Sequence, residues 1–151
     1  IMILMMLIGG SPGSTAGGMK TTTIAVLILN AFATFGREPE TEVFGRRFDN
    51  TVVKNAATIA ILYFFLFFTG GIAISQIEHV ALSDCLFETA SAVGTAGLTL
   101  GITTELGLVS HLILVVLMYL GRVGGLTLIY AAISVKIQSG AKRPLDKITV
   151  G

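Results

Sequence analysis

The sequence predicts an all-α integral membrane protein, and its charge distribution is the main reason. Of the 151 residues, 53% are hydrophobic and only 13% are charged, against about 25% in soluble domains. Residues 55–77 hold no charge, and residues 106–135 hold only Arg122. A helix needs about 20 apolar residues to cross a bilayer, so each stretch can span it. A net charge of +1 excludes a basic nucleic-acid binder, and the single cysteine excludes a disulfide framework.

The N-terminal third predicts a broken membrane helix. Residues 1–8 are apolar without a basic region or cleavage site, so they do not form a secretory signal. We expect them to end a membrane helix, and the chain to be the C-terminal portion of a longer protein. Residues 9–20, GGSPGSTAGGMK, hold five glycines and disfavour helix. The apolar segment 21–35 follows, and the charged, Pro- and Gly-containing segment 36–51 is a predicted linker.

Residues 52–135 predict the order helix, short helix, loop, helix. The first span runs from 52 to about 75, and the second from 108 to 135. A short helix over 83–92 begins with Ser-Asp, which suits an N-cap. The following stretch 91–101, SAVGTAGLTLG, is rich in glycine and threonine. An ordinary extracellular loop is the alternative, which this composition disfavours.

Basic residues predict the topology. They concentrate in 36–54 and after Lys136, whereas 76–107 contains no Lys or Arg. The positive-inside rule places the first zone and the tail 136–151, including the C-terminus, in the cytoplasm, and 76–107 outside.

The segment 93–98 is a candidate cation filter. Backbone carbonyls of an extended strand can replace the hydration shell of a cation, and glycine adopts the backbone angles that this requires. The preceding short helix would direct its partly negative C-terminal end at the ion. We expect a Cβ at Gly97 to find no room in this strand. The candidate filter residues are Val93, Gly94, Thr95, Ala96, Gly97 and Leu98.

Four motifs resemble one family. ETASAVGTAGLTLG, GGSPGSTAGGMKTTT, LGRVGGLTL and RPLDKITVG are similar to segments of the Trk/Ktr/HKT superfamily of potassium transporters, in particular the Ktr-type membrane subunit. The resemblance implies four fused potassium-channel-like repeats of helix, pore helix, filter loop and helix. Residues 1–35 would end the third repeat, with an intramembrane glycine-rich loop, and 52–135 would form the whole fourth. Leu98 and Thr99 depart from the Thr-Val-Gly-Tyr-Gly filter of true potassium channels, which implies a weaker, shorter filter.

The resemblance implies potassium uptake through a selective pore in the cell membrane, without enzymatic chemistry or a cofactor. It leaves Na⁺ coupling open. It also implies a homodimer in the lipid bilayer that assembles on a cytosolic nucleotide-binding regulatory ring. A secondary transporter that binds a small solute at broken helices is the alternative, but it would want polar or charged residues at the breaks. A membrane enzyme would need a nucleophile–base or metal constellation, which two distant histidines do not supply.

The loop 9–20 has three interpretations. The first is a phosphate-binding loop: Gly13 and Gly18 have the spacing of its two glycines, but Met19 occupies the position of the required lysine. A passive helix break is the second. The resemblance favours the third, a mobile gate beneath the filter. The candidate gate residues are Gly9, Gly10, Ser11, Gly13, Ser14, Thr15, Gly17, Gly18 and Arg122.

Arg122 lies near the middle of the predicted second span, about 14 residues from either end, where a charge usually faces a partner or a cavity. A snorkelling arginine is the alternative. The resemblance places Arg122 below the filter, where it would donate to loop carbonyls and repel cations. Glu88 either pairs within the pore region or is solvated. His79 and Cys85 are expected to be structural, without a metal site.

Overall fold

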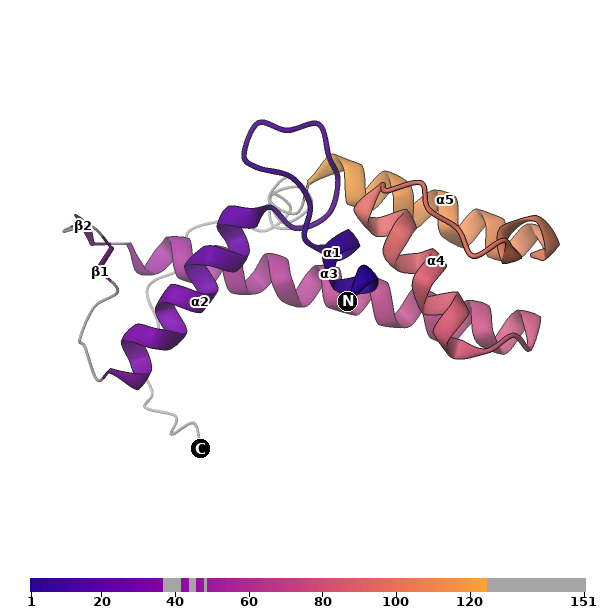
Figure 1. Ribbon diagram of the computed structural model, residues 1–151, viewed down its shortest axis with the longest axis horizontal. Coiled ribbons are helices and arrows are strands. Elements are labelled where there is room, and N and C mark those ends of the chain that lie inside the picture. Colours follow the sequence, from indigo (N-terminus) through magenta and orange to yellow (C-terminus); the bar gives the residue numbers. More distant parts are fainter. Residues whose placement is uncertain (37–41, 44–45, 48, 125–151) are drawn as a thin grey trace, which may run out of the picture.

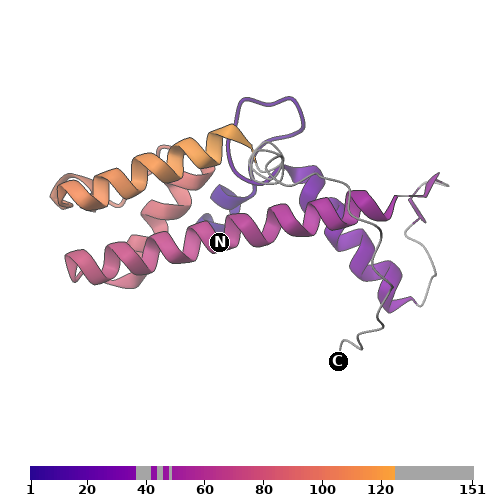
Figure 2. The same ribbon diagram turned by 180° about the vertical axis from the view of Figure 1, so that it is seen from behind.

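The computed structural model describes residues 1–36, 42–43, 46–47 and 49–124, and their regular secondary structure is almost entirely helical (Figures 1 and 2). The predicted all-α class is confirmed, apart from two short strands that pair antiparallel in the predicted linker, Glu42 with Arg47 and Val43 with Arg46. The elements are α1 (Met2–Leu7), α2 (Thr21–Phe35), β1 (Glu42–Val43), β2 (Arg46–Arg47), α3 (Asn50–Glu78), α4 (Leu82–Gly94), the 3₁₀ helix η1 (Ile102–Glu105) and α5 (Leu108–Val123).

Helix α3 contains the predicted first span. Its 29 residues correspond to about 43 Å of helix, and it is the one helix among the described residues that is long and apolar enough to cross a membrane. Asp49 caps its start by accepting a hydrogen bond from the Thr51 N–H at 3.2 Å. The helix ends at His79, which adopts the left-handed conformation with φ 55°.

Helix α4 is the buried centre of the fold, in contact with α1, α3 and α5. Every residue from Phe87 to Gly94 is buried. The expected Ser-Asp cap is wrong: the helix begins at Leu82 after Ala81, without a side-chain cap, and the Ser83 hydroxyl donates to the Asp84 carboxylate instead. The helix also extends two residues beyond the predicted end.

Helix α5 is shorter than the predicted second span. It ends at Val123 because Gly124 takes φ 87° and ψ 136°, which are not helical angles. Arg122 therefore lies in the last turn of α5 rather than mid-helix, which corrects its predicted position. The remainder of the predicted span, 125–135, and the tail 136–151 lie outside the described residues.

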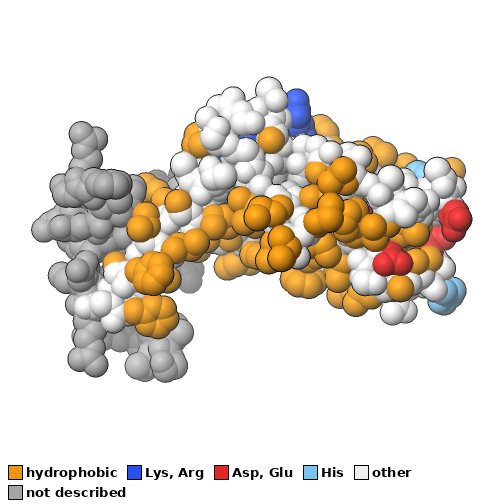
Figure 3. Space-filling model, in the orientation of Figure 1, with side chains coloured by type: hydrophobic (Ala, Val, Ile, Leu, Met, Phe, Trp, Pro, Cys, Tyr) orange, Lys and Arg blue, Asp and Glu red, His pale blue; other side chains and the backbone are white. Residues whose placement is uncertain are grey.

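The outward faces of α3 and α5 are apolar. Large hydrophobic side chains such as Ile61, Phe65 and Tyr119 are each more than 60% exposed. Figure 3 shows hydrophobic side chains over the middle of the molecule, with acidic and histidine side chains gathered at one end and basic ones beside the loop 9–20. Such a surface is unusual for a soluble monomer and is suited to contact with lipid.

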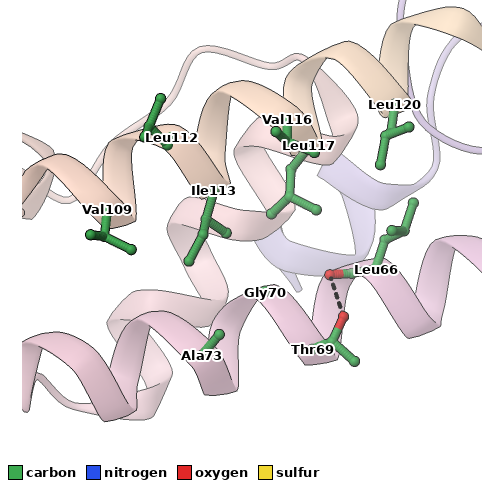
Figure 4. Close-up of a pocket in the computed structure, with 10 residues that line it drawn as sticks. All are labelled: Leu66, Thr69, Gly70, Ala73, Val109, Leu112, Ile113, Val116, Leu117 and Leu120. Carbon is green, nitrogen blue, oxygen red and sulfur yellow. Dashed lines mark hydrogen bonds between the residues drawn. The ribbon is translucent and has the colours of Figure 1, made fainter.

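An apolar groove of about 450 Å³ runs between α3 and α5 (Figure 4). Thr69 is its one hydroxyl side chain, and it donates to the Phe65 carbonyl of its own helix at 2.6 Å, so the one hydroxyl proton in the groove is used within α3. Its lining residues are Leu66, Thr69, Gly70, Ala73, Val109, Leu112, Ile113, Val116, Leu117 and Leu120.

Candidate ion filter and gate loop

Two of the six candidate filter residues are helical, so the non-helical part of the candidate filter begins at residue 95 rather than 93. Val93 and Gly94 belong to the last turn of α4, and the helix stops at Thr95, which is left-handed with φ 52° and ψ 35°. The N–H groups of Thr95 and Ala96 close this end by donating to the carbonyls of Ala92 and Ser91. The non-helical filter segment, defined here as residues 95–101, starts directly at the partly negative end of α4.

Helix α4 holds every second residue of the filter segment through its backbone N–H. Ala96 donates to the Ser91 carbonyl at 2.9 Å, Leu98 to the Ser91 hydroxyl at 2.9 Å, and Leu100 to a Glu88 carboxylate oxygen at 3.0 Å. In a trans peptide, the carbonyl of one residue points opposite to the N–H of the next, and the described chain contains no cis peptide. The carbonyls of residues 95, 97 and 99 therefore point away from α4.

The backbone angles of the filter segment also alternate. Thr95 and Gly97 have positive φ values of 52° and 73°, whereas Ala96 and Leu98 do not have positive φ. A left-handed residue is unfavourable for most side chains and routine for glycine. This explains the glycine at position 97.

The expectation that a Cβ at Gly97 would lack room is wrong within the described chain. A Cβ built on Gly97 meets no atom within 4 Å, and the same is true of Gly101. What demands glycine at these positions is the positive φ, 73° and 97° respectively. The physical reason is conformational rather than steric.

Glu88 is paired rather than solvated, which decides between its two interpretations. The side chain is buried on α4, with 4% exposed. One carboxylate oxygen accepts from the Thr99 hydroxyl at 2.6 Å and from the Leu100 N–H, and the other accepts from the Thr103 hydroxyl at 2.8 Å. Sequence reasoning did not find these two threonines.

The loop 9–20 is anchored at its two ends and open at its tip. Gly9 donates to the Met19 carbonyl at 2.6 Å, and Met19 donates to the Leu7 carbonyl at 3.0 Å. This pairing continues from a helix, α1, so the strand that a phosphate-binding loop requires does not precede it. Residues 11–15 at the tip are exposed, and Figure 1 shows the loop as an arch beside the C-terminal end of α5.

The anchored end of the loop contacts the filter and α5. Gly17 donates to the Thr95 hydroxyl at 2.9 Å. Gly18 donates to the Gly121 carbonyl at 3.3 Å, and the same carbonyl accepts from the buried Tyr63 hydroxyl of α3 at 3.3 Å. The loop, the start of the filter and two helices therefore meet in one place.

Two basic side chains, those of Arg122 and Lys20, donate hydrogen bonds to backbone carbonyls near the loop tip. Arg122 donates to the Thr15 carbonyl at 2.5 Å. Lys20 donates to the carbonyls of Ala16 at 2.6 Å and Ser14 at 3.0 Å. Sequence reasoning missed Lys20, although it is the one charged residue between 1 and 36 and is the last residue of the glycine-rich stretch. The role of these residues in gating stays a prediction.

A cavity of about 500 Å³ lies between α1, the loop and the filter segment. None of its lining side chains is ionisable, so the polar groups that it offers are backbone atoms and one hydroxyl. His79 and Cys85 take no part in it, and no three His, Cys, Asp or Glu side chains gather at a metal-binding distance among the described residues. The lining residues are Ile1, Met2, Met5, Met6, Ile8, Gly9, Gly10, Ala16, Gly94, Thr95, Ala96 and Leu98.

The long helix α3 and the apolar outward faces of α3 and α5 are consistent with a helical membrane protein. The residue pattern of the TrkH family, described as cation transport proteins, matches residues 1–141. The chain belongs to this family, which confirms the resemblance.

Individual proteins to which the chain is similar agree with this family assignment. The chain is 34% identical over 155 residues to potassium/sodium uptake protein NtpJ of Enterococcus hirae, covering 99% of the chain and 34% of that protein. It is 33% identical over 149 residues to Ktr system potassium uptake protein B of Bacillus subtilis, covering 99% and 33%. An uncharacterized cation transporter of Mycoplasma pneumoniae is 40% identical over 132 residues, covering 82% and 23%. The chain spans about a third of the length of the first two.

Proposed function

We propose that this chain contributes one quarter of a potassium-selective pore to an uptake protein of the cell membrane. In this proposal residues 52–135 form the fourth repeat, α4 (Leu82–Gly94) is the pore helix, and the filter segment is one of four strands around the ion. Two of the relatives named above are potassium uptake proteins. The transported ion is K⁺, and Na⁺ coupling is a part of the proposal that transport measurements must decide.

The observation that supports this proposal most directly is the hydrogen bonding of the filter segment. Three alternate N–H groups donate to α4, so three carbonyl oxygens face the other way, where an ion can use them in place of water. The end of α4 adds a partly negative potential at the same place. The ion then passes by exchange between such sites, driven by its electrochemical gradient, without covalent chemistry.

The loop 9–20 acts as the gate in this proposal. Gly17 touches the side chain at the start of the filter segment, and the loop borders the cavity below it. Retraction of the exposed tip would widen the path, and a cytosolic nucleotide-binding ring would bias this movement in a homodimeric assembly with cytoplasmic C-termini. A transporter for an organic solute is less well supported, because no ionisable side chain lines the cavity.

Gly97→Ala tests the filter assignment. Alanine at φ 73° strains the backbone by roughly 1–2 kcal/mol, so the carbonyl of residue 97 should turn and discrimination between K⁺ and Na⁺ should fall severalfold. The measurement is K⁺ and Na⁺ uptake by the complete gene product in cells that lack their own potassium transport.

Gly13→Ala is the matched comparison. Gly13 has φ 86°, and a Cβ added there would meet no atom within 4 Å, so alanine introduces the same kind of strain in the loop tip. We expect its K⁺/Na⁺ uptake ratio to equal that of the parent, whatever happens to the rate. An unchanged ratio in Gly97→Ala, with normal protein in the membrane, would contradict the filter assignment.

A further inference from the structure

Glu88 is a buried carboxylate to which the proposed ion pathway assigns no role. It lies on α4 with 4% of its surface exposed. A carboxylate that leaves water is unfavourable unless hydrogen bonds replace its hydration. Here three donors do so, and all three come from the segment just beyond Gly97: Thr99, Leu100 and Thr103.

Through Thr99 and Thr103, the hydrogen bonds of Glu88 hold the turn formed by residues 99–103. Besides donating to Glu88, the Thr99 hydroxyl accepts from the Gly101 N–H at 2.9 Å, and its oxygen lies 2.7 Å from that of Thr103. Thr103 lies in η1, which begins after Gly101. One carboxylate therefore fixes residues 99–103 to α4. Three of the roughly four acceptor sites of this carboxylate are used by these donors, so the contacts of Glu88 hold the chain rather than leave the carboxylate open to a cation.

The bond to Leu100 has a consequence for the filter. The peptide between residues 99 and 100 is planar and trans, so its carbonyl points opposite to the N–H that Glu88 holds. Ser91 fixes the corresponding carbonyls of residues 95 and 97 through its own two acceptors. Leu98 and Leu100 are about half exposed, so hydrogen bonds rather than side-chain packing hold this end of the strand.

We propose that Glu88 is a positioning residue that sets ion selectivity by holding the carbonyl of Thr99, the last of the three that point away from α4, toward the ion. The inference rests on the proposed function. Hydrogen bonds to an ionised group are shorter and roughly twice as strong as neutral ones, so a carboxylate resists the collapse of the carbonyl ring around the smaller Na⁺ better than a neutral acceptor does.

The main experiment compares K⁺ and Na⁺ uptake by the complete gene product in cells lacking their own potassium transport. Glu88→Gln keeps the size of the side chain and weakens its hydrogen bonds. We expect the K⁺/Na⁺ uptake ratio to fall roughly tenfold, about the effect of one charge-assisted hydrogen bond. The amount of protein in the membrane and its melting temperature serve as folding controls, since a merely structural role would change these and not the ratio.

Thr103→Val and Thr104→Val form a matched pair. Valine has nearly the shape of threonine without the hydroxyl. Thr103→Val removes one of the Glu88 donors, and the ratio should fall by a smaller factor. Thr104 is its exposed neighbour and donates to the Gly101 carbonyl rather than to Glu88, so Thr104→Val should keep the ratio of the parent.

The outcomes separate this inference from the proposed function. A parent protein that does not discriminate K⁺ from Na⁺ refutes the proposed function. If the parent discriminates and Glu88→Gln keeps its ratio at normal membrane levels, the role of Glu88 is refuted and the filter stands. If Glu88→Gln does not reach the membrane, Thr103→Val decides: a lowered ratio at a normal melting temperature supports the inference, and an unchanged ratio overturns it.

Discussion

The loop 9–20 and the filter segment look alike in sequence, yet Gly9 and Gly17 at the base of the loop need glycine for a different reason from Gly97 and Gly101 in the filter segment. A Cβ on Gly9 would overlap the Gly17 carbonyl oxygen, and a Cβ on Gly17 would lie 2.6 Å from the Thr95 methyl group. In the filter segment, Gly97 and Gly101 have open space around them but positive φ. Close backbone packing therefore holds the base of the loop, whereas backbone angle determines the filter.

Two further glycines link these regions. A Cβ on Gly94, at the end of α4, would overlap the Met6 carbonyl oxygen of α1, and one on Gly121 of α5 would overlap the Val93 carbonyl oxygen of α4. The helices beneath the filter thus touch through their backbones. This rigid junction carries the loop on one side and the filter segment on the other, so substitutions in it should affect assembly before they affect transport.

The largest effect is expected from Gly121→Ala. The new methyl group meets backbone on α4, which cannot rotate away, so the two helices must separate. Overpacking of this kind destabilises by about 1–3 kcal/mol or more. We expect a lowered melting temperature of the detergent-solubilised protein and less protein in the membrane.

Gly70→Ala is the matched control for this substitution. Gly70 also lies in a helix, but a Cβ there meets the end of the Leu117 side chain at 2.6 Å, which can change rotamer. Its melting temperature should stay closer to that of the parent. If both variants melt alike, backbone contact is not what distinguishes the two sites.

A smaller effect is expected from shortening the loop tip. Residues 11–15 are exposed, and a Cβ on Gly10 would lie 3.2 Å from the Cβ of Ala16, so one glycine can bridge residues 10 and 16, given 3.8 Å between successive Cα atoms. The closely packed base of the loop stays intact. If the tip obstructs the pathway, ion flux through reconstituted protein should rise and depend less on the regulatory partner. A variant that folds but conducts no faster would favour a passive loop.

The sequence predicted the elements whose limits are set locally. Helix α2 occupies residues 21–35 as expected, because the glycine-rich loop adjoins it on the N-terminal side and Gly36 on the other. The end of α5 was missed because the apolar run continues past Gly124, and hydropathy does not register one residue with φ 87°. The distinction between a helix and a strand at Val93 and Gly94 depends on contacts with α1 and α5, which no local pattern contains.

In the candidate site, too, features that depend on local composition were predicted from the sequence, whereas contacts between distant residues were not. The candidate filter and the candidate gate loop were selected from their composition, because both predicted functions need a backbone that can approach closely or turn unusually. The partners of Glu88 were not found, since Thr99 and Thr103 are 11 and 15 residues away and reach it only because the segment after α4 folds back along that helix. Lys20 was missed because its role depends on a loop that folds back on it.

The smallest effect is expected from Arg122→Gln, which tests whether charge or contact restrains the loop tip. Arg122 is exposed and makes one hydrogen bond to the loop, to the Thr15 carbonyl. Lys20 continues to hold the neighbouring carbonyls of Ser14 and Ala16 when Arg122 is replaced. Loss of one such bond is worth about 0.5–1.5 kcal/mol, so flux through reconstituted protein should rise roughly twofold to tenfold, less than after shortening the tip.

Arg122→Lys separates the two roles, because lysine keeps the positive charge and loses the planar fork of the guanidinium. If the charge raises the barrier for a passing cation, flux in Arg122→Lys should stay near that of the parent while flux in Arg122→Gln rises. If the hydrogen bond to Thr15 matters instead, both variants should conduct faster, since the shorter-reaching ammonium does not reproduce the guanidinium geometry. Poor membrane levels in both, without a gain of flux, would indicate that Arg122 stabilises the junction. Normal assembly and parental flux in both would remove Arg122 from the control of permeation and leave Lys20 as the cation that holds the loop.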